Sequence, residues 1–221
     1  MMDRNETLQT SKSNRPQTNA LIWGIPITAI QLDARELDAW FDTIDLDELC
    51  QEEFSYSACK TSNGLDANYE IDYTPINDIV YDHFSTYLDN LGPKMVLTSE
   101  LEVPWINVYE EHGFQDAHDH QGTRCSDFSW CYVHESGDSH IVFKNRNSTN
   151  SDACMSEILD AYEAHIDFVP ELTVKGTLYL FPSTIYHAVS PNKSTSPRIT
   201  ISGNIRVRPA TTDALNMDNH S

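Results

Sequence analysis

Three histidines in the C-terminal half of this chain have the residue type and spacing needed to bind one metal ion. His118 and His120 are separated by a single residue, and His187 follows far downstream. Side chains two positions apart in a β-strand point to the same face, so the first two imidazoles can reach one ion together. Three ligands on one side of an ion leave open coordination positions, which non-haem Fe(II) uses to bind a co-substrate and O₂. We therefore predict a metal site at these three residues.

Arg198 begins a segment in which polar and β-branched residues alternate. On a strand, the polar residues of this segment share one face and its isoleucines share the other. Such a segment is either an amphipathic edge strand or a strand whose polar face lines a cavity. In a cavity, the guanidinium can hold a carboxylate through two parallel hydrogen bonds. A dicarboxylate such as 2-oxoglutarate suits both features, because one end can chelate iron while the other end binds Arg198.

Five more polar or aromatic residues are candidates for lining the same cavity. Two of them alternate with apolar residues in one β-rich stretch, two share the face of Arg198, and one lies in a third stretch. They are Asn107, Tyr109, Thr200, Asn204 and Tyr132. We assign all five to co-substrate binding, and the alternative for each is packing within the barrel or core.

The elements that must position these residues fall into a helical part followed by a β-rich part. Residues 21–32 are apolar and β-branched and predict a strand, and apolar residues at helical spacing predict a helix from about 34 to the low fifties. A second helix begins at Thr74 and ends at Gly92, since proline favours the first turn and a Gly-Pro pair stops a helix. About nine short β-rich segments then alternate with turns, as in a sandwich or barrel. Helices that precede such strands should pack outside the β layer.

The length of 221 residues suits a single domain with polar ends. Residues 1–19 show no hydrophobic periodicity, and we predict a disordered tail there. We expect one domain over 20–208, in which 20–93 supply the N-terminal strand and helices and 94–208 form the β-barrel core. The remaining residues, 209–221, are predicted to be a second polar tail.

The acidic composition limits the partners that the chain is expected to have. Its 14 Lys and Arg residues against 34 Asp and Glu residues give a formal net charge of −20. A surface of this sign repels nucleic-acid phosphates and anionic membranes, so we expect neither as a partner. Five cysteines without a CxxC pair favour a reducing compartment. With no apolar run of membrane-spanning length and no signal-peptide core, we expect a cytoplasmic location.

The motifs around the candidate residues resemble those of the Fe(II)- and 2-oxoglutarate-dependent oxygenases, in particular small microbial and phage proteins of that superfamily. They cover roughly the last half of the chain, in the expected order: WINVY at 105–109, HDH at 118–120, GTLYLFPS at 176–183, His187, and RITISGN at 198–204. The resemblance implies a mainly β fold with N-terminal helices, a double-stranded β-helix that is jelly-roll-like and cupin-like, with iron at its open end. It also implies that His118 and His187 ligate Fe(II) and that Arg198 binds the distal carboxylate of 2-oxoglutarate. The phage members extend the expected location to the cytoplasm of an infected host cell.

One position departs from the pattern of the wider superfamily, which has His-X-Asp or His-X-Glu where this chain has His120. Either the site uses three histidines or a nearby carboxylate replaces His120. Asp116 would share the face of His118 in a regular strand, whereas Asp119 would need a bulge or bend to turn inward. We favour His120 and keep Asp116 or Asp119 as the alternative carboxylate ligand.

The function that the resemblance implies is an Fe(II)- and 2-oxoglutarate-dependent dioxygenase, an oxidoreductase that hydroxylates a substrate the sequence does not identify. Its partners would be the small-molecule co-substrate, O₂ and that substrate. Two alternatives share the fold. One is a cupin-type dioxygenase with three histidine ligands that does not use 2-oxoglutarate. The other is a non-catalytic jelly-roll module for binding or structure, because lectin and capsid domains have the same architecture.

Overall fold

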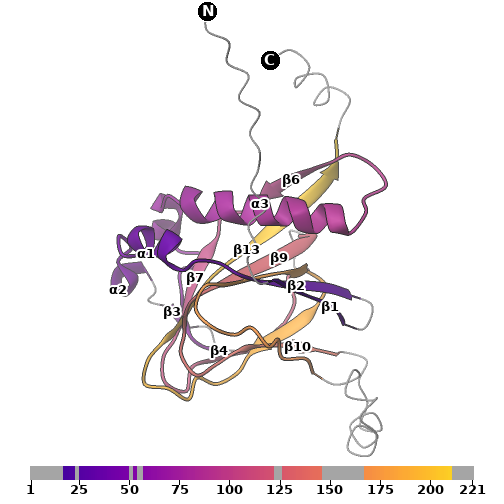
Figure 1. The fold of residues 1–221 in the computed structure, drawn as a ribbon. Helices are drawn as coiled ribbons and strands as arrows, with labels where there is room; N and C mark the ends of the chain where they lie inside the picture. The colour runs from indigo at the N-terminus through magenta and orange to yellow at the C-terminus, as the bar shows by residue number, and fades with distance from the viewer. Residues whose placement is uncertain are drawn as a thin grey trace, which may run out of the picture.

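Two antiparallel sheets form a barrel whose larger sheet is covered by helices (Figure 1). A computed structural model of the chain describes residues 17–22, 25–49, 52–53, 57–121, 126–145 and 167–210. In these residues the order of elements is a β-hairpin, two short helices, three two-residue strands, a 3-10 helix, one long helix and then the remaining strands. The fold is a mainly β, double-stranded β-helix with its N-terminal helices outside, as predicted.

The larger sheet has nine strands and supplies most of the barrel wall. In spatial order it consists of β1 (Gln17–Ile22), β2 (Ile25–Gln31), β11 (Thr177–Pro182), β9 (Phe128–Ser136), β13 (Arg198–Pro209), β7 (Trp105–Tyr109), β5 (Lys60–Thr61) and β3 (Glu52–Glu53), with β6 (Leu97–Leu101) paired to the end of β13. Long β13 lies between β9 and β7 and places Arg198 opposite Tyr109. The polar face of β13 is thereby held at the centre of the sheet.

The smaller sheet has four strands and carries two of the candidate metal ligands. Its order is β10 (Ile141–Lys144), β12 (Tyr186–Val189), β8 (Phe114–His118) and β4 (Ser57–Ala58). His187 in β12 is directly opposite His118 in β8. The residues between β10 and β11 include the segment 146–166, which lies outside the described residues.

The helices form the layer outside the larger sheet. They are α1 (Arg35–Phe41), α2 (Leu46–Leu49), the 3-10 helix η1 (Asp66–Glu70) and α3 (Thr74–Asn90). Pro75 lies in the first turn of α3, and Gly92 follows its end with φ of 67°, a conformation that glycine adopts without strain. The helix predicted from 34 to the low fifties is instead two short helices. The N–H groups of Thr43 and Ile44 bond carbonyls three residues back, which tightens the chain into a turn and ends α1.

The N-terminal part also differs from the prediction. The strand expected at 21–32 is a hairpin, and its first strand begins at Gln17, inside the segment predicted to be a disordered tail. Residues 1–16 and 211–221 lie outside the described residues, so the proposed division into a domain and two tails stays a prediction. Within the part of the chain that the structure describes, no helix is long and apolar enough to cross a membrane.

The hydrophobic core has two layers, one on each face of the larger sheet. Between sheet and helices, Phe84 of α3 packs with Tyr87 and Phe128, and Ile201 of β13 faces the same layer. Between the two sheets, Phe143 of β10 meets residues of β2, β9 and β11. The alternation along β13 is therefore confirmed, because its isoleucines face the helices and its polar residues face the barrel interior.

Replacing Phe84 by alanine should destabilise the protein by about 3–5 kcal/mol, the usual cost of truncating a fully buried aromatic residue. Phe84 has an exposed fraction of 0% and stacks edge-on against Phe128 at 5.2 Å between ring centroids. Urea denaturation would measure the change. The matched control is Tyr81→Ala on the same helix, where 48% exposure predicts a change within about 0.5 kcal/mol. Equal losses in the two variants would contradict the packing described for α3.

Candidate metal and co-substrate site

The three histidines predicted as metal ligands lie together inside the barrel. One ring nitrogen from each of His118, His120 and His187 lies within 4.8 Å of the other two. Their ring centroids are 4.4 Å apart for His118 and His187, 5.0 Å for His120 and His187, and 5.3 Å for His118 and His120. Among the described residues, no other cluster of His, Cys, Asp or Glu meets the same criterion. The sequence spacing therefore predicted a real spatial cluster.

A bulge in β8 decides which side chains of this strand face the barrel. His118 pairs with His187, but Val189, two residues further along β12, pairs with Gln115, three residues back along β8. The extra residue shifts the alternation, so Gln115 and His118 both face the cavity. Asp116 is exposed instead of sharing the face of His118, which corrects the expectation based on a regular strand.

His120 lies just beyond the end of β8, where its main chain is fixed by the turn that follows β11. Its N–H donates to the carbonyl oxygen of Ser183 at 3.0 Å, and its ring stacks on Trp105 with centroids 5.8 Å apart. The carboxylate of Asp119 accepts a hydrogen bond from the N–H of Gln121 and is not part of the histidine cluster. The geometry thus favours His120 over either aspartate as the third ligand.

Hydrogen bonds at the far ring nitrogen fix the tautomer of each imidazole. The Nδ1 atom of His118 lies 2.8 Å from the carbonyl oxygen of Asp116, and that of His187 lies 3.1 Å from the carbonyl oxygen of Ile185. A carbonyl oxygen can only accept, so Nδ1 carries the proton and Nε2 has a free lone pair. In His120, Nε2 is buried without a hydrogen-bond partner. A buried imidazole nitrogen with a free lone pair is suited to coordinate a metal ion.

Burial keeps all three imidazoles uncharged at neutral pH. It is the main reason that the pKa of His120 falls to about 4 and the pKa of His187 falls well below its ordinary value. The neighbouring imidazoles add to the effect in both cases, and burial also lowers the pKa of His118. Neutral imidazole is the form that binds iron, so the donor set fits Fe(II) without having to lose protons.

Arg198 is a buried cation that the protein itself does not neutralise. Its exposed fraction is 0%, and although Nη1 donates to the carbonyl oxygen of Ser139 at 3.0 Å, Nε and Nη2 have no hydrogen-bond partner. Six other Lys and Arg side chains of the described residues pair with carboxylates, and Arg198 does not. An unpaired buried charge is costly, so two free donors on one guanidinium indicate a site for an anion.

One narrow cavity connects the histidines with Arg198. Strand β7 lines it with alternate residues, among them Asn107 and Tyr109, and β13 adds Thr200 next to Arg198. These three side chains lie where the sequence placed them. The hydroxyl of Tyr109 donates to Oε1 of Gln115 at 2.9 Å, so the small and large sheets are linked across the cavity.

Two of the residues assigned to co-substrate binding lie elsewhere. Tyr132 faces the helices and belongs to the outer core, because Cys131 and not Tyr132 points inward from β9. Asn204 does not line the cavity but lies behind His120, with Oδ1 2.7 Å from Nδ1 of that ring. Gln115, Cys131 and Ser202 line the cavity and were not assigned to it. Only Ser202 carried a signal, since it shares a strand face with Arg198.

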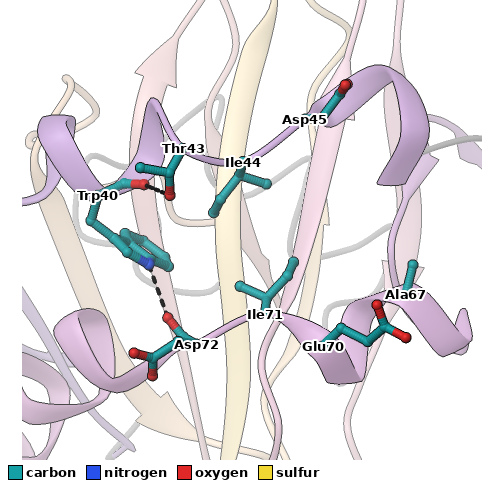
Figure 2. Close-up of a pocket in the computed structure, with 8 residues that line it drawn as sticks. All are labelled: Trp40, Thr43, Ile44, Asp45, Ala67, Glu70, Ile71 and Asp72. Atoms are coloured by element: carbon teal, nitrogen blue, oxygen red, sulfur yellow. Dashed lines mark hydrogen bonds between the residues drawn. The ribbon is translucent and has the colours of Figure 1, made fainter.

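A second hollow, of about 460 Å³, lies outside the barrel between the end of α1 and η1. Figure 2 shows Ile44 and Ile71 facing each other across it, and Nε1 of Trp40 donating to the carbonyl oxygen of Asp72 at 2.9 Å. Its lining contains carboxylates but no imidazole and no guanidinium. The candidate site is therefore the narrow cavity inside the barrel, although the outer hollow is larger.

Residues 103–204 match a family model described as "Putative 2OG-Fe(II) oxygenase". The matched span contains the three histidines, Arg198 and the strands that hold them. In this span the chain is similar to the 2OG-Fe(II) oxygenases. No curated protein matches the sequence.

Solved structures show that the oxygenase fold extends over most of the chain. A prolyl-4-hydroxylase from Pseudomonas putida aligns with a TM-score of 0.52 at 14% identity, over 87% of this chain and 93% of that one. The carbocyclase SnoK of nogalamycin biosynthesis aligns with 0.56 at 11% identity, over 88% and 86%. HygX from Streptomyces hygroscopicus, crystallised with nickel, 2-oxoglutarate and hygromycin B, aligns with 0.52 at 10% identity, over 83% of each chain. At these identities the likeness shows a shared fold.

Proposed function

We propose that this oxygenase oxidises an organic substrate with Fe(II) held by His118, His120 and His187 and with 2-oxoglutarate held by Arg198. The observation that supports the proposal best is that three neutral imidazoles and an unneutralised guanidinium share one cavity. This combination fits a ligand with a metal-chelating end and a distant carboxylate. Hydroxylation is the expected outcome.

The residues around the co-substrate have separate tasks in this proposal. Nε and Nη2 of Arg198 would donate two parallel hydrogen bonds to the distal carboxylate of 2-oxoglutarate. Thr200 and Tyr109 lie beside that guanidinium and would orient the carboxylate, while apolar Ile141 and Phe181 would exclude water from the chain of the co-substrate. Fe(II) and 2-oxoglutarate, when bound, would supply the electrons that activate O₂, which is the oxidant, and the protein would orient them.

The three-histidine donor set also suits a cupin-type dioxygenase that does not use 2-oxoglutarate. The free donors of Arg198 favour the 2-oxoglutarate-dependent hypothesis, because a dioxygenase that does not use 2-oxoglutarate has no need of a buried group that binds a carboxylate in the same cavity. A non-catalytic module would have no reason to keep three neutral imidazoles with converging nitrogens. Both alternatives remain distinguishable by experiment.

The test is succinate formation from 2-oxoglutarate by the purified protein, loaded with Fe(II) without oxygen and then exposed to O₂. Slow succinate formation without substrate should rise when a substrate is added. The substrate panel should include proline peptides and hygromycin B, which the names of similar solved structures suggest, and cationic compounds, which the net charge of −20 would attract. Iron binding without any use of 2-oxoglutarate would favour the cupin-type alternative, and absence of stoichiometric iron would favour the binding module.

A further inference from the structure

We infer that Asn204 is a positioning residue of the metal site. It orients the ring of His120, and Glu102 in turn orients the side-chain amide of Asn204. The inference rests on the proposed metal site and concerns how one of its ligands is held. Nδ1 of His120 is 2.7 Å from Oδ1 of Asn204, and Nδ2 of Asn204 donates to Oε2 of Glu102 at 3.2 Å. The three side chains thus form a chain of hydrogen bonds that ends at the metal site.

Glu102 decides which way the amide of Asn204 faces. A carboxylate can only accept hydrogen bonds, so the NH₂ group of the amide must face Glu102 and its oxygen must face His120. The oxygen in turn can only accept, so Nδ1 of His120 must carry the proton. The lone pair is therefore left on Nε2, the buried atom without a hydrogen-bond partner. The polarity of the whole chain follows from the single charge at Glu102.

The surroundings hold Glu102 and Asn204 rigidly. Glu102 pairs with Arg206 at 2.6 Å between Oε1 and Nη2, and its N–H donates to the carbonyl oxygen of Asn204. The hydroxyl of Ser129 also donates to Oδ1 of Asn204 at 3.0 Å. Ser129 is in turn hydrogen-bonded to the hydroxyl of Ser183, whose carbonyl oxygen accepts the N–H of His120. His120 is thus held at its ring and at its main chain by one connected network.

His120 differs from the other two histidines in depending on a side chain. His118 and His187 have their tautomers fixed by main-chain carbonyl oxygens two residues earlier, which any residue at those positions would supply. His120 lies past the end of β8, and the hydrogen-bond acceptor for its Nδ1 is the side-chain amide oxygen of Asn204 instead of a main-chain carbonyl oxygen. Asn204 is therefore the position where a substitution can release a ligand without altering it. Outer hydrogen bonds of this kind orient the ring and raise its basicity.

The test is Co(II) affinity, measured by titration of the visible absorption of Co(II) in the absence of 2-oxoglutarate. Asn204→Ala should weaken Co(II) binding by about 10–100-fold, the usual effect of removing a partner of a ligating histidine. Its absorption spectrum should also change, because His120 can then turn or adopt the other tautomer. The double variant Glu102→Gln with Asn204→Asp should restore affinity, since the Gln amide can donate to the new carboxylate, which still accepts from Nδ1 of His120.

Asn68→Ala is the matched control for a general loss of structure. Asn68 is also buried and holds three partners, Ser62, Tyr73 and the carbonyl oxygen of Pro104, outside the metal site. It should lower stability and leave Co(II) affinity unchanged. If Asn204→Ala binds Co(II) like the wild type, or if both variants lose affinity equally, the inference is wrong. Failure of the wild type itself to bind Co(II) would instead overturn the proposed function.

Discussion

Replacing His187 by alanine should abolish metal binding and all turnover of 2-oxoglutarate. His187 has an exposed fraction of 5%, and its ring is near both other histidines, so its loss leaves two ligands on one side of the site. The decrease in metal affinity should exceed the roughly 10–100-fold that outer partners of a ligand contribute. Iron content after anaerobic loading and the rate of succinate formation would measure the two effects.

His134→Ala provides the control for removing a buried histidine. His134 is 6% exposed, but it stacks on Phe41 in the helix layer, with ring centroids 3.7 Å apart, on the other face of β9. This variant should lose stability and keep its iron. If His187→Ala retained stoichiometric iron, the cluster of imidazoles would not be the metal site, and the proposed function would be wrong.

The alternation of residue types predicted the site best where each strand has one polar and one apolar face. In β13, Thr200 and Ser202 alternate with isoleucines, so the sequence alone shows which side chains point inward. In β9 the central residues are buried on both faces, and nothing in the sequence distinguishes Cys131 from Tyr132. Tyr132 was wrongly assigned for this reason, because a strand buried on both faces shows no alternation of polar and apolar residues.

Local irregularities were invisible to the same reasoning. The bulge in β8 inserts one residue between Gln115 and His118, and the segment FQDAH contains no glycine to mark it. It turns Asp116 outward and thereby removes a carboxylate that a regular strand would have placed beside His118. Helix α3 was predicted well because Pro75 and Gly92 mark its ends, whereas the turn after Phe41 had no such residue.

Replacing Arg198 by alanine should weaken 2-oxoglutarate binding by about 2–5 kcal/mol, as expected when one side of a buried charge pair is truncated. The free donors Nε and Nη2 have no substitute in the cavity, since the other lining groups near them are the neutral Thr200 and Tyr109. Isothermal titration of 2-oxoglutarate into protein loaded with a redox-inert metal would measure the loss. The affinity of Arg198→Lys for 2-oxoglutarate should lie between those of the wild type and Arg198→Ala, because lysine keeps the charge but lacks the planar pair of donors.

Arg198→Leu separates this anchor role from a structural one by the sign of its effect on stability. Without co-substrate, Arg198 is a buried charge with no carboxylate beside it among the described residues, so replacing it by an apolar side chain should leave the thermal midpoint unchanged or raise it. With excess 2-oxoglutarate, the wild type should gain stability by binding, and the leucine variant should not. Because a structural arginine would give the opposite result in the absence of co-substrate, a large fall in the midpoint of Arg198→Leu, or an unchanged affinity for 2-oxoglutarate, would remove Arg198 from the co-substrate site.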